Sequence, residues 1–519
     1  MWGASYVEWP WLWQQRSFEE ACCEGVSSDE DRQDIAWMHD LTPEKCLCFD
    51  TPYRPSCNRR ASMQPSRSIT VLYLRPECPS SKEHHKFTQV TDMHWDHDHI
   101  VHISGETETL NDPVPDASLW RKRIEPWLSA VFQAEHLSLL LGNGFTTGIA
   151  SYAGGVSTSM AGSGFGGCPH EDKVVAHAKK LAETMGRGSA NIEDQLSAAL
   201  TLLAGLQILE HADVAAWETA IDNVLGGFIK GVLATERSIS DGINNEPAGG
   251  GPSTREILIS FIMSFASRTA SRERLHIFTT NYDRLIERGC DYAGLRIIDR
   301  FTGALEPEFR SSRLHVDMHY MPPGIRGEPR HLEGVIHFTK LHGSLDWRYD
   351  KSRLYRTGLP FGADAKHPAI PESPRSSVMI YPNAAKDVET ATYPYADLFR
   401  DFSSSICRPN NVLVTYGYGF GDDHINRIIM DMLTIPSTHL VILAWSKKPH
   451  ERIASFVSRV GRPQQLTLLI GEHFGDIRTL VEHYLPKPAI DPLTIRMSEL
   501  VERRGKIVAQ TPNEDGSGS

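Results

Sequence analysis

From about residue 136 onward, short apolar runs alternate with amphipathic segments, and this alternation limits the possible folds more than any other feature. The apolar runs predict strands at 137–141, 275–280, 334–341, 378–381, 412–416, 439–444 and 466–470. Helices are predicted at 119–134, 282–289, 396–407, 422–433, 449–460 and 474–485, mostly between these strands. Strand–helix alternation of this kind indicates a parallel sheet covered by helices on both faces. The sequence therefore predicts an α/β chain with a doubly wound parallel sheet.

A helical insertion of about residues 170–270 interrupts the alternation. Asn191 is predicted to cap a helix whose first turn holds Glu193 and Asp194. The negative charges of these two residues interact favourably with the helix dipole. No catalytic role is assigned to them. A flexible linker is predicted over 238–252, which is rich in Asn and Gly.

Composition divides the chain into unequal parts. Eight of the eleven Trp precede residue 130 and six of the nine Cys precede residue 80, whereas the strand pattern begins later. We expect a poorly defined, disordered leader over 1–115, a catalytic domain over 116–490 and a polar tail over 491–519. The formal net charge of −12 argues against nucleic-acid binding through bulk charge. Without an apolar span or a secretory signal, a cytoplasmic protein with no membrane partner is expected.

Four features follow predicted strands, where ligands bind in open α/β sheets. They are Gly142-Asn143-Gly144-Phe145-Thr146, Thr279-Thr280-Asn281-Tyr282-Asp283, Lys340-Leu341-His342-Gly343, and Tyr416-Gly417-Tyr418-Gly419 continuing to Asp422. Each has a structural alternative: a tight turn for the first, a helix cap for the second, a partly buried polar histidine for the third, and close backbone packing for the fourth. Their order along the chain is more informative than any one of them.

This order resembles the sirtuin family. The phosphate turn of the family, Gly-Ala-Gly followed by a hydroxyl residue, is matched by Gly142, Gly144 and Thr146. Its Thr-Gln-Asn-Ile-Asp is matched by Thr279, Asn281 and Asp283, and its catalytic His-Gly by His342 and Gly343. The sequence looks closest to bacterial sirtuin-like proteins of antiphage defence, which carry Thr-Thr-Asn-Tyr-Asp and Lys-Leu-His-Gly-Ser. The resemblance implies a Rossmann-like fold over about 119–486.

Two departures from the sirtuin deacylases bear on the substrate. The deacylases carry a zinc ribbon of two Cys-x-x-Cys pairs after the His-Gly, whereas this chain has one cysteine, Cys407, between residues 343 and 410. The Pro-Asp-Phe-Arg element that follows the first turn in deacylases is also missing. We therefore expect no zinc ribbon and no metal, and binding of an acetyl-lysine peptide is in doubt.

The resemblance implies a set of roles around NAD as a substrate. Asn281 and His342 would be catalytic, with His342 as general base and Asn281 positioning the ribose and the attacking water. The expected NAD-binding residues are Gly142, Gly144, Thr146, Thr279, Asp283, Gly417, Gly419 and Asp422. Among them, Asp283 would hold the nicotinamide carboxamide.

The leading hypothesis is an NAD hydrolase that releases nicotinamide and ADP-ribose and depletes NAD in antiphage defence. One alternative is a non-catalytic sensor that binds NAD or ADP-ribose and regulates a partner ATPase or nuclease. Another is a protein deacylase. The resemblance also implies a homo-oligomer, and a DNA-translocating ATPase is a candidate partner.

Overall fold

The structure is a computed structural model that describes residues 93–158, 162–184, 190–245, 250–312, 318–320, 330–350, 353–371, 373–380 and 393–487. The chain divides into two units, Met1–His84 and His85–Ser519, and the described residues all belong to the second. Most of the expected leader and the expected tail over 491–519 therefore lie outside the described residues.

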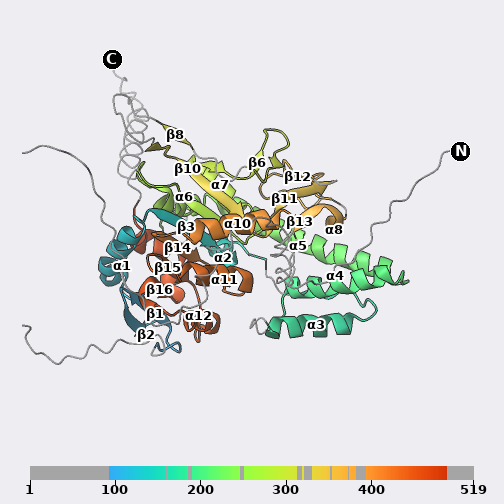
Figure 1. The fold of residues 1–519 in the computed structure, drawn as a ribbon, viewed down its shortest axis with the longest axis horizontal. Coiled ribbons are helices and arrows are strands. Elements are labelled where there is room, and N and C mark those ends of the chain that lie inside the picture. Colours follow the sequence, from blue (N-terminus) through green and yellow to red (C-terminus); the bar gives the residue numbers. More distant parts are fainter. Residues whose placement is uncertain are drawn as a thin grey trace, which may run out of the picture. The chain divides into compact units, whose positions relative to one another are not determined.

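A nine-stranded sheet forms the centre of this unit (Figure 1). Its strands are β1 (His99–Ile103), β2 (Glu106–Leu110), β3 (His136–Leu141), β4 (His276–Thr279), β5 (Arg296–Ile298), β10 (Val335–Lys340), β14 (Asn411–Tyr416), β15 (His439–Ala444) and β16 (Leu466–Ile470). The order across the sheet is β2-β1-β16-β15-β14-β3-β4-β10-β5, and the seven strands from β16 to β5 run parallel. Six neighbouring strands of the sheet are β10-β4-β3-β14-β15-β16. When they are numbered by their order in the chain, this arrangement is the 3-2-1-4-5-6 pattern of Rossmann folds. The predicted fold class is confirmed.

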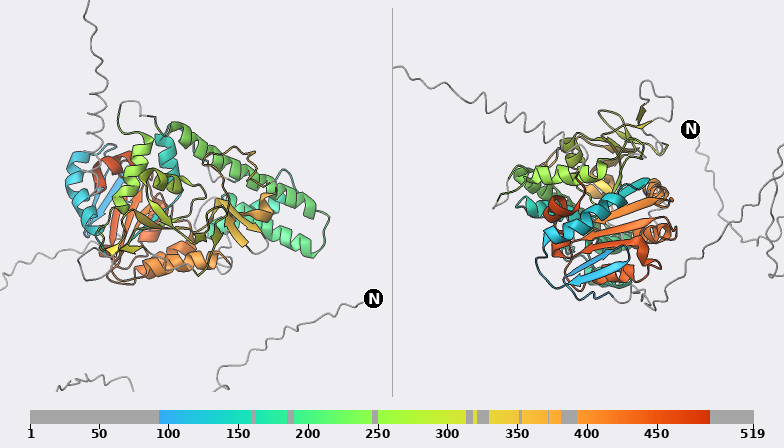
Figure 2. Two further views of the ribbon diagram at one scale, coloured as in Figure 1. Left: turned by 90° about the horizontal axis from the view of Figure 1, so that it is seen from above. Right: turned by 90° about the vertical axis from the view of Figure 1, so that its left-hand side faces the viewer.

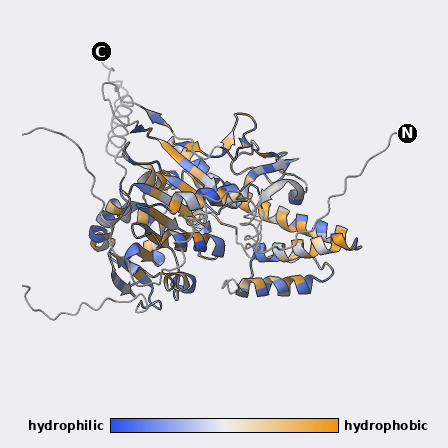
Figure 3. Cartoon of the chain, viewed as in Figure 1, coloured by the Kyte–Doolittle hydropathy of each residue, from blue (hydrophilic) through white to orange (hydrophobic). Residues whose placement is uncertain are grey.

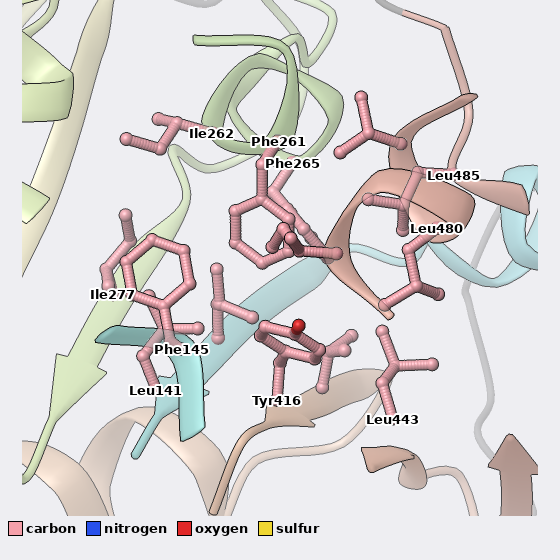
Figure 4. Packing of buried hydrophobic residues seen from close by; sticks show 14 of the residues in the cluster. Leu141, Phe145, Phe261, Ile262, Phe265, Ile277, Tyr416, Leu443, Leu480 and Leu485 are labelled. Atoms are coloured by element: carbon pink, nitrogen blue, oxygen red, sulfur yellow. The ribbon is translucent and has the colours of Figure 1, made fainter. Parts of the chain in front are cut away.

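Helices cover both faces of this sheet, as the sequence predicts. One face carries α1 (Ala117–Val131), α2 (Asn143–Tyr152), α6 (Thr254–Ala266), α7 (Leu285–Ala293) and η3 (Leu480–Tyr484), and the other carries α10 (Tyr395–Ile406), α11 (Asp423–Met432) and α12 (Glu451–Val457). Successive strand residues point to opposite faces, so that Leu139 and Leu141 enter one core and Leu140 the other. Figure 4 shows the first core, where Phe145 and Phe261 pack around Tyr416.

The strands β1 and β2 correct the expected boundary of the leader at residue 115. The strand β1 pairs antiparallel with β16 on one side and with β2 on the other, so the sheet begins at residue 99 (Figure 2). All five side chains of β1 are buried, including Ile100 and Val101 at 0% exposure. The strand β1 has only five residues and follows a segment rich in His and Asp. Its apolar pattern is therefore too short to be recognised in the sequence.

This placement predicts different outcomes for two N-terminal deletions. Deleting residues 1–110 removes β1 and β2 and exposes the edge of β16, whereas deleting residues 1–92 leaves the nine strands in place. Each fully buried aliphatic side chain of β1 contributes about 1.5–3 kcal/mol. We therefore expect the longer deletion to unfold at a clearly lower temperature in circular dichroism. Equal midpoints for the two deletions would contradict the pairing of β1 with β16.

The helical insertion forms a cluster of its own beside the sheet (Figure 1). It consists of α3 (Glu171–Thr184), α4 (Ile192–Ile208) and α5 (Val214–Gly242), and α3 shows alternating hydrophilic and hydrophobic bands in Figure 3. Asn191 caps α4 as predicted, in a reciprocal capping box with Asp194. The predicted linker over 238–252 is partly wrong, because α5 extends to Gly242. The buried Ile239 continues its apolar face.

A second, antiparallel sheet is formed by strands that lie on both sides of His342 in the sequence. Its order is β13-β11-β12-β7-β6, with β6 (Phe301–Thr302), β7 (Glu308–Phe309), β11 (Gly343–Asp350), β12 (Arg353–Arg356) and β13 (Val378–Ile380). A separate pair joins β8 (His319–Tyr320) and β9 (Arg330–His331). Of the five strands of the antiparallel sheet, the sequence predicts only β13. None of the helices in the described part of the chain is long and apolar enough to cross a membrane.

Candidate active site

Two glycine-rich loops meet where the strand order of the large sheet reverses. Gly142 follows β3 and Gly417 follows β14, and the N–H of Gly144 donates to the carbonyl of Gly417 over 3.0 Å. A Cβ atom on Gly142 would lie 2.5 Å from that carbonyl oxygen, and one on Gly144 would lie 2.6 Å from the Gly417 Cα. Gly417 itself has a φ of +64°. These glycines therefore permit close packing of the two loops, which places α2 directly at the switch point.

A pocket of about 360 Å³ opens at this point. It is lined by Gly142, Asn143, Gly144, Thr146, Ser157, Thr158, Asn191, Glu193, Phe228, Val232, Thr235, Thr280, Asn281, Tyr282, Asp283, His342, Gly417, Tyr418, Gly419, Gly421, Asp422 and Arg452. Nine of the ten predicted site residues are among them. The remaining one, Thr279, is fully buried beneath the pocket. The structure thus brings together predicted site residues that are up to 280 positions apart, from Gly142 to Asp422.

Thr279 and Asn281 are fixed by hydrogen bonds to the first glycine loop. The Thr279 hydroxyl donates to the carbonyl of Leu141 over 2.9 Å and accepts from the backbone N–H of Asn281 over 3.0 Å. The Asn281 side-chain nitrogen donates to the Gly142 carbonyl and to the Thr146 hydroxyl, each over 3.0 Å. This network holds the Asn281 amide at the pocket wall, and both hydrogens of its nitrogen are engaged in hydrogen bonds within the protein.

Hydrogen bonds also fix the Asp283 side chain. Its carboxylate accepts from the Thr146 hydroxyl over 2.8 Å and from the N–H of Leu285 over 3.0 Å. The Lys340 ammonium donates to the Asp283 carbonyl and also forms an ion pair of 3.1 Å with Glu287. The carboxylate therefore binds the first N–H of α7, although Arg284 and not Asp283 occupies the N-cap position, and it also lines the pocket.

His342 occupies the turn between β10 and β11. Gly343 adopts a φ of +90°, which glycine adopts readily, at the point where the chain passes from the large sheet to the antiparallel sheet. The imidazole is 5% exposed, and its ring centre lies 6.4 Å from that of Tyr282 and 5.6 Å from that of His424. Asp422 reaches the same pocket from the N-cap position of α11.

Glu193 is a pocket residue that the sequence interpretation missed. It lies in the first turn of α4, is 6% exposed, and accepts a hydrogen bond of 3.2 Å from the Tyr282 hydroxyl. Burial raises the pKa of Tyr282 well above that of a free phenol, and the charge of Glu193 adds to the effect. The phenol thus stays protonated and donates to the carboxylate. The capping pattern locates the start of the helix, but only the docking of the insertion places Glu193 at the pocket.

A larger cavity of about 1050 Å³ adjoins the pocket. The two share Gly144, Arg452 and the segment from Gly417 to Gly419. The larger cavity continues past Trp445 and Lys447 after β15 to Arg478. Arg452 is not predicted from the sequence, because a single arginine in a short helix belongs to no recognisable motif. Its position between the cavities suits an anion that spans them.

A comparison with protein families identifies a SIR2-like domain over residues 275–460. This range includes Asn281, His342 and the second glycine loop, whereas β3 and the first glycine loop precede it. The match supports the resemblance to sirtuins and an NAD-related, sirtuin-type function. A comparison with curated proteins finds no match.

Proposed function

We propose that this protein hydrolyses NAD at the nicotinamide–ribose bond, releasing nicotinamide and ADP-ribose. One observation carries the proposal: Asn281 and His342 both line the pocket at the switch point of the sheet. A site that only bound NAD would need neither a positioned amide nor an imidazole beside the ribose. The adjoining cavity has room for the ADP part of the substrate, with Arg452 near the pyrophosphate.

The pocket chemistry suits departure of a cationic leaving group. Nicotinamide leaves easily because its pyridinium becomes neutral, and the transition state resembles an oxocarbenium ion, as in glycoside hydrolysis. His342 takes the proton of the ribose hydroxyl or of the attacking water. The Asn281 nitrogen already donates to Gly142 and Thr146, so its Oδ1 is the atom that receives the water or the ribose hydroxyl. The Glu193 carboxylate stabilises the positive charge that develops on the ribose.

Incubation of the purified full chain with NAD, followed by chromatography, tests the proposal. Nicotinamide and ADP-ribose should form without any peptide. Binding of NAD without turnover would instead indicate a sensor, and turnover only with an acetylated peptide would indicate a deacylase. NAD depletion in the cytoplasm during phage infection, homo-oligomer formation and control by a DNA-translocating ATPase are further parts of the proposal. These parts are supported by the resemblance of the sequence motifs to those of sirtuin-like proteins of antiphage defence.

The Glu193→Gln substitution should lower kcat by about 10²-fold, because it removes a negative charge facing a cationic transition state. The amide keeps the shape of the side chain and can still accept from Tyr282, so ADP-ribose binding should change little. Glu183→Gln, which alters a carboxylate of the same insertion at 58% exposure, is the matched control. Steady-state kinetics and calorimetry provide the two measurements. An unchanged kcat in the Glu193 variant would remove this residue from the mechanism.

A further inference from the structure

We propose that His342, Asp422 and His424 form a binding site for a divalent transition metal of the Zn²⁺ class, and that the bound ion inhibits the enzyme. The inhibitory part rests on the proposed NAD hydrolysis, in which His342 is the general base. The binding part rests on the geometry of the three side chains alone. This proposal departs from the expectation of no metal, which rests on the missing cysteine pairs.

The three side chains offer two imidazole nitrogens and one carboxylate oxygen within 4.8 Å of one another. Zinc binds these atoms at about 2.0–2.2 Å in tetrahedral sites, which places ligand atoms about 3.4 Å apart. Small side-chain rotations therefore suffice to close the site around an ion. Imidazole and carboxylate are ligands that zinc accepts together.

The segments that carry the ligands are held in place by the protein. In the loop before α11, the Tyr418 hydroxyl donates to Asn426 Oδ1 over 3.0 Å, and the Asn426 side-chain nitrogen donates to the Phe420 carbonyl over 3.0 Å. These bonds tie the backbone around Asp422 to α11. The ring of His424 packs edge-on against Phe399, with ring centres 4.9 Å apart. Supporting contacts of this kind orient metal ligands.

Three protein ligands leave a fourth position for water or substrate, and two of the ligands, His342 and Asp422, line the pocket. The open position would therefore face the space proposed for the ribose. An imidazole nitrogen that coordinates a metal cannot accept a proton at the same time. Occupancy of the site would thus remove the general base and obstruct the ribose, without altering the fold.

The test is a Zn²⁺ titration of the full chain by calorimetry, comparing wild type with His424→Ala and His424→Gln. His177→Ala, which removes an exposed histidine of α3, is the matched control for loss of an imidazole. Wild type and the control should bind one Zn²⁺ more than either His424 variant, with folding verified by circular dichroism. Equal stoichiometry in all four proteins would overturn the site.

Inhibition is measured as the Zn²⁺ concentration that halves the metal-free rate of each protein. Loss of one ligand should raise that concentration by at least about 10-fold in both His424 variants. Activation by Zn²⁺, or equal inhibition of all four proteins, would overturn the inhibitory role. If even wild type fails to hydrolyse NAD, the proposed function fails, while the difference in stoichiometry still decides whether the site exists.

Discussion

Replacement of His342 with alanine is expected to lower kcat for NAD hydrolysis by about 10²–10⁴-fold, the usual contribution of a general base. The side chain ends in the pocket and lies in a turn, so its removal leaves the strands β10 and β11 intact. Folding should therefore be retained, and ADP-ribose should bind with nearly its wild-type affinity. Kinetics with NAD and calorimetry with ADP-ribose measure these two quantities.

The His177→Ala control should keep full activity, because that residue lies on the exposed face of α3. Replacement of Asn281 is less easily interpreted, since its nitrogen also joins the Gly142 carbonyl and the Thr146 hydroxyl. Asn281→Ala would thus disturb the glycine loop as well as the chemistry. A His342→Ala enzyme that turns over NAD at the wild-type rate would be incompatible with general-base catalysis by this residue.

The large sheet and most of the candidate site could be predicted from the sequence for the same physical reason. Strands such as β3 are buried on both faces and read as continuous apolar runs, and the motifs come directly after them. Because the parallel strands end at one edge of the sheet, residues as distant as Gly142 and Asp422 converge there. Motifs that are distant in the sequence therefore line one pocket.

Features that depend on docking between segments could not be predicted. The second sheet includes strands of two residues, such as β6 and β7, which are too short to give a pattern of their own. They pair with each other, and they join the sheet only because Glu308 of β7 pairs with the distant Tyr355 of β12. Glu193 has an ordinary helix-start pattern, and its role depends on where the insertion packs. Similarly, the glycines of the two loops suit phosphate binding in sequence, whereas the structure shows that packing of one loop on the other already requires Gly142, Gly144 and Gly417.

A buried ion pair joins the helical insertion to the segment that follows β4. Glu236 of α5 and Arg284, which directly follows Asp283, are 0% and 8% exposed, and their side chains approach within 2.5 Å. Glu236 also accepts from the backbone N–H groups of Arg284 and Gly362 over 2.8 and 3.0 Å. Arg284 in turn donates to the carbonyls of Leu359 and Pro360. The pair therefore links the insertion, the Thr279–Asp283 motif and the loop after β12.

Glu236→Gln is expected to destabilise the protein by about 3–5 kcal/mol, because it leaves the Arg284 charge buried without a counter-charge. Urea unfolding followed by circular dichroism measures the loss. Asp364→Asn is the matched control, since it makes the same carboxylate-to-amide change in the neighbouring pair with Arg237, where both side chains are exposed. Its unfolding midpoint should stay at the wild-type value, because solvent screens the exposed pair. Equal midpoints for both variants would show that the insertion is held to the pocket by apolar packing instead, through contacts such as that between Phe228 and Tyr282.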